Sequence, residues 1–289
     1  MAKGRELKGR IKSVENTRKI TRTMEMVATS KMKRAQDRVV AARPYANALA
    51  EVISSLYSAD LAERFPLLRQ PAQQRRVALV VITSNRGLAG GFNANLIKEA
   101  RARLVDLEGR GVQVDVHVIG KKGAGYFRYV GRALASQRAD ITDKPTAANA
   151  ATIVDSLMDD FAAERLDGVY VTYARFVSAL STPPTTEQIL PVTPPAPREG
   201  GMQRDYIITP SAETILTELL PSYVRNAVYR ALVENEAGFQ SAQRTAMKNA
   251  TDNAGDILNV LRRTYNRARQ AQITQEIAEI VGGAAALQG

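Results

Sequence analysis

The amino-acid sequence predicts an α/β fold in which a central domain with a mainly parallel sheet is inserted between two long helices. These helices are expected to pair as an antiparallel, left-handed coiled coil. Apolar residues recur every three or four positions over a long stretch at each end of the chain. Between these stretches, β-branched runs alternate with helical patterns. We therefore expect an N-terminal helix over residues 1–60, the α/β domain over 75–205 and a C-terminal helix over 210–289.

The N-terminal stretch is typical of one long basic helix. Its apolar residues, with Ile20 among them, keep helical spacing from Leu7 to Leu56, and Pro44 can bend such a helix without ending it. Up to residue 43 there are 13 Lys or Arg against 4 Asp or Glu, a net charge of +9. The whole chain has a net charge of +11, so most of the surplus lies on this helix. Such a surface indicates an acidic partner: nucleic acid, an anionic membrane or acidic protein loops.

The middle of the chain has the pattern of a small Rossmann-like domain. Arg75–Thr83 is a continuous β-branched run, which suits a strand buried on both faces. Further strands are predicted at 112–120, 168–177, 185–192 and, briefly, at 206–209, and helices at 93–107, 124–130 and 147–164. Strands that alternate with helices indicate crossover connections and a mainly parallel sheet.

The C-terminal stretch predicts the longest helix. Ser211 is a candidate N-cap for a first helical segment, and Pro221 stands where the long helix is expected to begin. From there the apolar stripe continues for about 65 residues, or roughly 100 Å. A helix of that length must bury its stripe against another helix, and the N-terminal helix is the simplest partner. Because the segment between them is compact, the pair is expected to be antiparallel, and heptad-like spacing predicts a left-handed supercoil. The N-terminal helix is too short to cover the end beyond about Arg269.

The sequence offers no constellation for catalysis or metal binding. It has no cysteine, which excludes disulfides, thiolate metal sites and cysteine nucleophiles. Its one histidine, His117, lies inside an alternating strand and is interpreted as structural. The loops Gly87–Gly91 and Gly120–Gly125 follow strands, where α/β folds bind phosphate, but neither has the full glycine fingerprint or a following Lys-Ser/Thr. We therefore expect no catalytic residue, cofactor or metal on this chain, and a structural or protein-contact role for the loop at Gly87.

The composition leaves several classes of function open. No apolar run is long enough to span a membrane, and the N-terminus lacks the apolar core of a signal peptide, so export is not expected. The residues alone favour an elongated scaffold or coupling element with acidic protein partners. The alternative is a basic coiled-coil scaffold that binds nucleic acid, and a third class is an enzyme with a small-molecule site on the α/β domain.

Three stretches of the sequence together form a specific signature. They are SVENTRKITRTMEMVATSKMKRAQDR (Ser13–Arg38), TSNRGLAGGFNANL (Thr83–Leu96) and AMKNATDNAGDILNVLRRTYNRARQAQITQEIAEIVGGAAAL (Ala246–Leu287). In this order they resemble the gamma subunit of F-type, proton-translocating ATP synthases of bacteria, and the likeness covers essentially the whole chain.

The resemblance implies a central-stalk rotor subunit, which couples proton-driven rotation of the membrane c-subunit ring to conformational cycling of the catalytic beta subunits. It implies one copy in a hetero-oligomer with the alpha and beta subunits, the epsilon subunit and the c-subunit ring, and no nucleic acid partner. ATP or ADP and magnesium would be bound by partner subunits, so this chain would have no catalytic site. The expected location is peripheral, on the cytoplasmic face of the bacterial cell membrane.

The resemblance also assigns contacts with the surrounding stator subunits. Met24 is similar to the position that faces an acidic lever loop of beta, and Lys31, Lys33 and Arg34 would add charge attraction there. The loop Arg86–Ala89 is similar to the segment that meets the same lever. Ala89 stands where many relatives have a cysteine, and the cysteine pair of plant chloroplast relatives is absent, so thiol control is excluded.

The last contacts implied by the resemblance lie near the C-terminus. Gln270, Thr274 and Glu276 match positions that hydrogen-bond the stator near the top of the shaft. Beyond them an apolar tip would turn within an apolar sleeve, and it comprises Ile277, Ile280, Val281 and Leu287.

Overall fold

The computed structural model describes residues 2–56, 64–141, 143–193 and 211–286. The chain forms two compact units, one of Met1–Ala28 with Gln243–Gly289 and one of Thr29–Ala242. Helix α1 (Ala2–Leu56) and helix α6 (Ala212–Ala286) contribute to both units. Although both helices are long, no helix in the described ranges is apolar enough over a sufficient length to cross a membrane.

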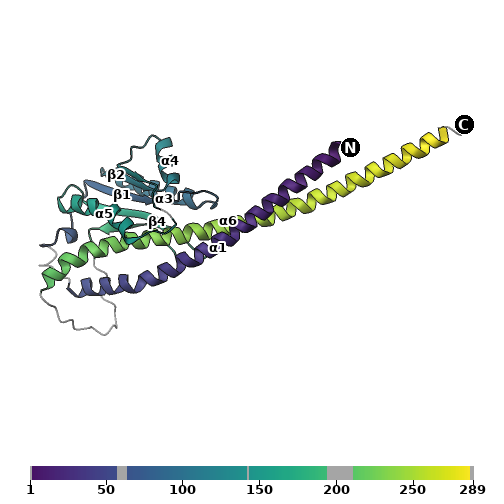
Figure 1. Ribbon diagram of the computed structural model, residues 1–289. Coiled ribbons are helices and arrows are strands. Elements are labelled where there is room, and N and C mark those ends of the chain that lie inside the picture. The colour runs from purple at the N-terminus through teal and green to yellow at the C-terminus, as the bar shows by residue number, and fades with distance from the viewer. Residues whose placement is uncertain (1, 57–63, 142, 194–210, 287–289) are drawn as a thin grey trace. The chain divides into compact units, whose positions relative to one another are not determined.

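The first unit is an antiparallel pair of helices. Arg262 on α6 forms an ion pair with Glu15 on α1 at 2.5 Å, and further along the hydroxyls of Thr251 and Thr21 lie 2.8 Å apart. Residue numbers therefore fall along α1 while they rise along α6, which confirms the predicted antiparallel pairing. Figure 1 shows the two helices side by side, with α6 extending past the start of α1. The left hand of the supercoil stays a prediction.

The buried seam of this pair differs from the apolar stripe read from the sequence. Ile20 was expected in the seam, but its side chain is 59% exposed, whereas the next residue, Thr21, is buried. One residue is a rotation of about 100° around a helix, so only one of the two can face α6. Thr21 can be buried there because its hydroxyl meets that of Thr251, which is also buried.

This hydroxyl pair gives a first prediction. Thr251→Val keeps the side-chain shape but removes the hydroxyl that Thr21 meets across the two helices, so that Thr21 keeps only its bond to the Arg18 carbonyl, and we expect the free energy of unfolding to fall by about 1 kcal/mol. The double variant Thr21→Val/Thr251→Val should recover part of this loss because it leaves no buried hydroxyl facing an apolar side chain across the seam. Guanidinium denaturation followed by circular dichroism measures both. Thr264→Val is the control, since this exposed hydroxyl bonds only the Val260 carbonyl of its own helix. Equal losses in the single and double variants would contradict the pairing.

The second unit contains a five-stranded sheet with the order β3-β2-β1-β4-β5. Strands β1 to β4 are parallel and β5 is antiparallel to β4. The strands are β1 (Arg76–Ile82), β2 (Gln113–Ile119), β3 (Ser136–Arg138), β4 (Gly168–Ala174) and β5 (Pro184–Leu190). The connecting helices are η1 (Pro66–Leu68), α3 (Phe92–Gly109), α4 (Lys121–Tyr129) and α5 (Ala147–Ala162). This arrangement confirms the predicted α/β domain with a mainly parallel sheet.

Strand β1 shows how the sheet is covered on both faces. Side chains alternate along a strand, and Val77, Leu79 and Val81 pack with buried residues of α3 and α4. Ala78, Val80 and Ile82 pack on the opposite face against α5, α6 and the end of α1. All six side chains are buried, which confirms the strand predicted from its β-branched run.

One helix boundary predicted from the sequence was wrong. The long C-terminal helix does not begin at Pro221, because α6 is already helical from Ala212 and Pro221 lies inside it. A proline inside a helix costs about 3 kcal/mol, and here buried Leu220 and Val224 anchor the helix on either side. The capping expectation holds, since the Ser211 hydroxyl accepts from the Thr214 amide at 3.2 Å. Pro44 does not end α1, as predicted.

Two short elements were not predicted: strand β3 and the 3₁₀ turn η1. Each has only three residues, too few for a periodic pattern. The brief strand predicted at 206–209 lies outside the described residues. His117, read as structural, lies on β2 opposite Ser136 of β3, with its Nδ1 2.8 Å from the Ser136 hydroxyl.

Candidate functional site

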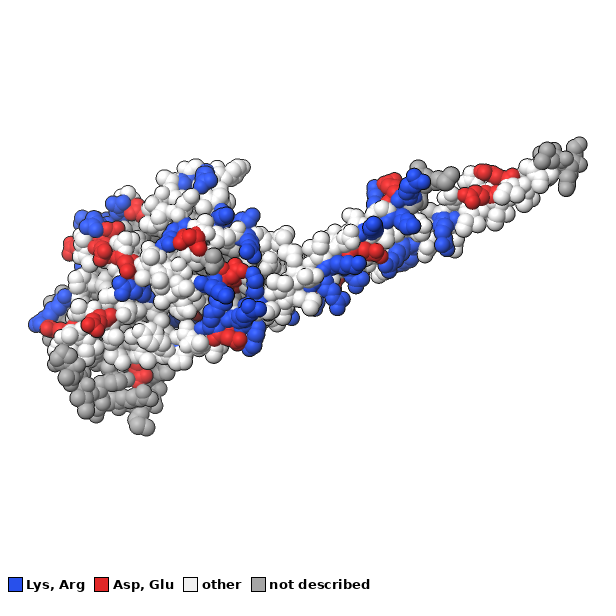
Figure 2. Space-filling view, viewed as in Figure 1, with Lys and Arg blue, Asp and Glu red and all other residues white. Residues whose placement is uncertain are grey.

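The predicted contact residues near the C-terminus form an exposed helical segment. Residues 273–284 of α6 are all exposed, including the apolar side chains of Ile277 (56%), Ile280 (71%) and Val281 (62%). Leu287 lies outside the described residues. Arg269 is the last Lys or Arg of the sequence, and the charged side chains that follow it are Glu276 and Glu279. Figure 2 accordingly shows a mainly white surface with two red patches near the end of α6. We call residues 273–284 the α6 tip.

The polar side chains of this region bond within their own helix. The Thr274 hydroxyl donates to the Gln270 carbonyl at 3.0 Å, and Gln272 donates to the Glu276 carboxylate at 2.9 Å. The side chains of Gln270, Thr274 and Glu276 are exposed, and that of Gln272 is half-buried. Because such bonds are made in water, they can be exchanged for bonds to a partner at little net cost. Met24, on α1 in the same unit, is half-buried.

The predicted cations of α1 in the second unit differ in their surroundings. Lys31 forms an ion pair with Asp143, and its side chain is one-third exposed. Lys33 pairs with Asp37 one turn along at 3.0 Å and is largely exposed. Arg34 is also exposed and donates to the Ser30 hydroxyl at 3.1 Å. Lys33 and Arg34 are thus accessible to a partner, whereas Lys31 is engaged within the chain.

The loop after β1 presents its residues in opposite directions. Arg86 is exposed, with Nη1 4.0 Å from Asp143 Oδ2. Leu88 is exposed with a positive φ of 62°, whereas Ala89 is only 3% exposed and packs against Phe92 and Phe239. A partner that meets this loop would therefore touch Arg86 and Leu88, while the side chain of Ala89 supports the loop from inside.

The carboxyl ends of β1 and β2 are where doubly wound α/β folds bind ligands. Here α6 fills that place: Leu232, Asn235, Glu236 and Phe239 line a cavity of about 40 Å³ together with the residues that follow the two strands. Small-molecule sites usually have about 300–1,000 Å³, and 40 Å³ holds only a few water molecules. This cavity is too small for a nucleotide.

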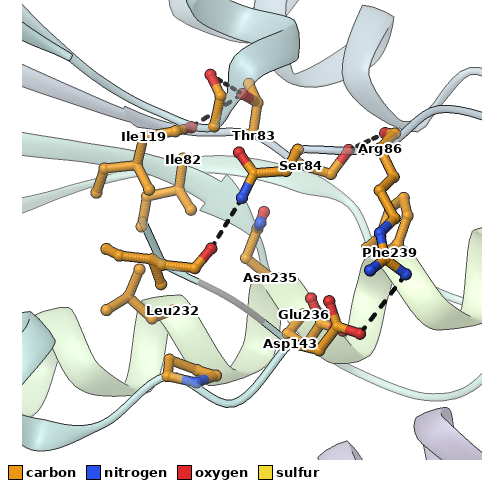
Figure 3. Close-up of a pocket in the computed structure, with 14 residues that line it drawn as sticks. Ile82, Thr83, Ser84, Arg86, Ile119, Asp143, Leu232, Asn235, Glu236 and Phe239 are labelled. Carbon is orange, nitrogen blue, oxygen red and sulfur yellow. Dashed lines mark hydrogen bonds and ion pairs between the residues drawn. The ribbon is translucent and has the colours of Figure 1, made fainter. Parts of the chain in front are cut away.

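Two carboxyl groups face this cavity (Figure 3). Burial raises the pKa of Glu236 to about 7, against the lowering effect of the hydrogen bond from Gln240, and the charge of Asp143 raises it further. Burial also acts to raise the pKa of Asp143, but the hydrogen bond and charge of Lys31 and the charge of Arg86 outweigh it and lower the pKa. Asp143 is therefore the ionised member of the pair near neutral pH. Across the described part of the chain, no group of three or more His, Cys, Asp or Glu side chains is placed to hold a metal.

Comparison with known proteins decides the family. The family model described as ATP synthase matches residues 3–287. The ATP synthase gamma chain of Gemmatimonas aurantiaca is 72% identical over 290 residues, which cover 100% of both chains. The chain belongs to the ATP synthase gamma chain family. The gamma chain of Psychrobacter cryohalolentis is 43% identical and covers 99% of this chain and 100% of its own length.

Solved structures agree with this membership. A central-stalk and c-ring structure of the Tetrahymena thermophila mitochondrial ATP synthase contains a chain with a TM-score of 0.61 and 25% identity, covering 80% of this gamma chain and 99% of that chain. A rotor structure of the Euglena gracilis mitochondrial ATP synthase has a TM-score of 0.65 over 94% and 99% of the two chains, and its 19% identity supports the fold alone. This gamma chain is a central-stalk rotor subunit and a non-catalytic part of the ATP synthase. The nucleic-acid alternative receives no support.

The sequence interpretation missed Asp143, Asn85 and Glu236, which join separate parts of the domain. The Asn85 amide donates to the carbonyls of Ala139 and Ile141 at 3.1 and 2.9 Å and so holds the segment that carries Asp143. Asp143 and Asn85 lie in loops without a periodic pattern. Glu236 carried no distinct signal either, because it stands among other polar residues, Glu234, Asn235 and Gln240.

Proposed function

We propose that this gamma chain couples proton-driven rotation of a c-subunit ring to conformational cycling of catalytic beta subunits, and thereby to ATP synthesis. The observation that carries this proposal is the α6 tip, which extends past the start of α1 and exposes Ile277, Ile280 and Val281. Exposed apolar side chains in a row indicate a surface that a partner covers. An apolar contact lacks directional bonds, so a helix can turn within it without breaking hydrogen bonds.

The second part of the proposal concerns the push on the beta subunits. A ligand or rotor shifts a conformational equilibrium only through different contact energies with the two states. The exposed cations Lys33, Arg34 and Arg86, together with Leu88, offer charge and apolar contact to an acidic loop of beta. Gln270, Thr274 and Glu276 would exchange their bonds within α6 for bonds to the stator. Met24 would face the acidic loop, and Ala89 would act by holding Leu88 in place.

The proposed assembly contains one copy of this chain with alpha and beta subunits, the epsilon subunit and the c-subunit ring. Nucleotide and magnesium are bound by partner subunits, and this chain contributes no cofactor site and binds no nucleic acid. The complex would lie on the cytoplasmic face of the bacterial cell inner membrane, with this chain as a peripheral part. The central-stalk and c-ring structure that contains the Tetrahymena thermophila relative supports this assignment, and the cavity at the carboxyl ends of β1 and β2 is too small for a nucleotide.

Co-expression with alpha and beta subunits of the same organism tests the proposal. We expect one copy of this chain to co-purify with three alpha and three beta subunits, and ATP hydrolysis to require the assembled complex. Native mass spectrometry gives the stoichiometry. Recovery of this chain only on its own, or in several copies per complex, would overturn the assignment.

A further inference from the structure

A partly buried cluster of charged groups joins three parts of the second unit. Glu236 on α6 lies beside Asp143, which belongs to the segment between β3 and α5 (Figure 3). Asp143 in turn binds two residues of α1: its carboxylate pairs with Lys31, and its carbonyl accepts from Arg38 Nη1 at 3.2 Å. Both long helices and the α/β domain therefore meet at one carboxyl pair.

The groups that face Glu236 come from each neighbouring element. From its own helix, Gln240 Nε2 donates to its carboxyl group at 2.6 Å. Asp143 repels its charge, whereas Lys31 and Arg38 on α1 attract it. Arg86, on the loop after β1, approaches the same Asp143 oxygen, Oδ2, that pairs with Lys31. Gln240 is only 1% exposed, and its Oε1 has no hydrogen-bond partner within the described structure.

We propose that Glu236 is a proton-operated latch, which holds the segment carrying Asp143 against α1 and α6 when protonated and loosens it when ionised. This role is independent of the rotor function proposed above. When Glu236 is neutral, the Asp143 carboxylate pairs with Lys31 without a second negative charge from Glu236. When Glu236 loses its proton, its charge repels that of Asp143 and competes with it for Lys31, beside a cavity that admits only a few water molecules.

The latch would operate near neutral pH. Burial raises the pKa of Glu236 to about 7 from an ordinary value of 4.5, so the native state binds this proton more tightly than the open state. The resulting stabilisation is fully present below about pH 4.5 and is lost as the pH rises through about 7. Asp143 does not cancel the effect, since its pKa is lowered and it stays ionised in this window.

Hydrogen exchange of the full-length chain between pH 5.5 and 8.5 tests the latch. After correction for the intrinsic pH dependence of amide exchange, opening at residues 139–141 and 143–146 should rise on the order of tenfold across this range, with a ceiling of roughly thirtyfold. Glu236→Gln keeps the side-chain shape but cannot ionise, so the corrected exchange of these amides should be the same at every pH. The control Asp155→Asn removes a carboxylate of α5 that pairs with Arg225 of α6, away from Glu236. Opening in this variant should rise with pH as steeply as in the wild type. The same slope in Glu236→Gln as in the wild type would overturn the proposal.

A measurement on the unmodified protein covers the case in which Glu236→Gln fails to fold. Carbon-13 NMR of the glutamate side-chain carboxyl, assigned to Glu236, gives its titration midpoint directly. We expect a midpoint near 7, together with chemical-shift changes at the Asn85 amide that follow the same curve. A midpoint near the ordinary value of 4.5, or an Asn85 amide that does not respond, would rule out the latch.

Discussion

Gly120→Ala is expected to destabilise the α/β domain by about 3 kcal/mol or more. Gly120 ends the turn from β2 into α4 with φ 98° and ψ 141°, a conformation that residues with a side chain rarely adopt. A Cβ atom there would lie 2.3 Å from the Thr83 carbonyl oxygen. Neither side can easily shift, because the Gly120 amide donates to the Arg138 carbonyl at 2.7 Å and the Thr83 hydroxyl donates to the Ile119 carbonyl at 2.9 Å. Backbone strain and steric overlap therefore add.

Gly111→Ala is the matched control for this prediction. Gly111 also has a positive φ, 79°, but a Cβ atom would have no neighbour within 4 Å. Only the conformational cost remains, about 1 kcal/mol. Guanidinium denaturation of both variants, followed by circular dichroism, measures the difference. Similar losses in the two variants would show that the close approach of Gly120 and Thr83 does not contribute.

The long helices and the central strands were predictable because their hydrophobic periods are strong and extend over many residues. In β1, the β-branched run predicts burial on both faces, and the sheet provides helices on both sides. The same reasoning failed at Ile20, since apolar character alone cannot distinguish adjacent positions of a helix when a threonine pair fills the seam. It also failed at Pro221, where tertiary packing outweighs the local preference of proline to begin a helix.

The candidate site was predictable only in part. The positions in α6 and the loop at Arg86 came from family resemblance, and the structure adds which of their side chains are accessible. Sequence periodicity could not place Asp143 beside Lys31, because residues more than 100 positions apart meet only through the sheet topology. The change in the pKa of Glu236 likewise depends on burial by segments distant in sequence, which no local pattern encodes.

The triple variant Ile277→Gln, Ile280→Gln and Val281→Gln is expected to weaken assembly with alpha and beta subunits at least tenfold without changing the stability of the isolated chain. These side chains are exposed in the free chain, and glutamine favours a helix about as well as the residues it replaces. A fully buried Ile or Val contributes about 1.5–3 kcal/mol. Even partial burial of these three side chains by a partner would therefore contribute several kcal/mol of binding free energy, which the triple variant would lose.

The control for the α6 tip is the double variant Ile257→Gln and Val260→Gln, which changes exposed apolar residues of α6 outside the tip. Thermal unfolding of the isolated chains should be the same for both variants and the wild type, because none of these side chains is buried there. The dissociation rate of the assembled complex, followed by native mass spectrometry after dilution, should rise only for the tip variant. If the tip variant dissociates no faster than the control, its apolar residues are not covered by a partner. If both variants dissociate faster, the contact surface extends along α6 rather than residing in the tip. A rise confined to the tip would identify the apolar end of α6 as the part of the chain that the stator surrounds.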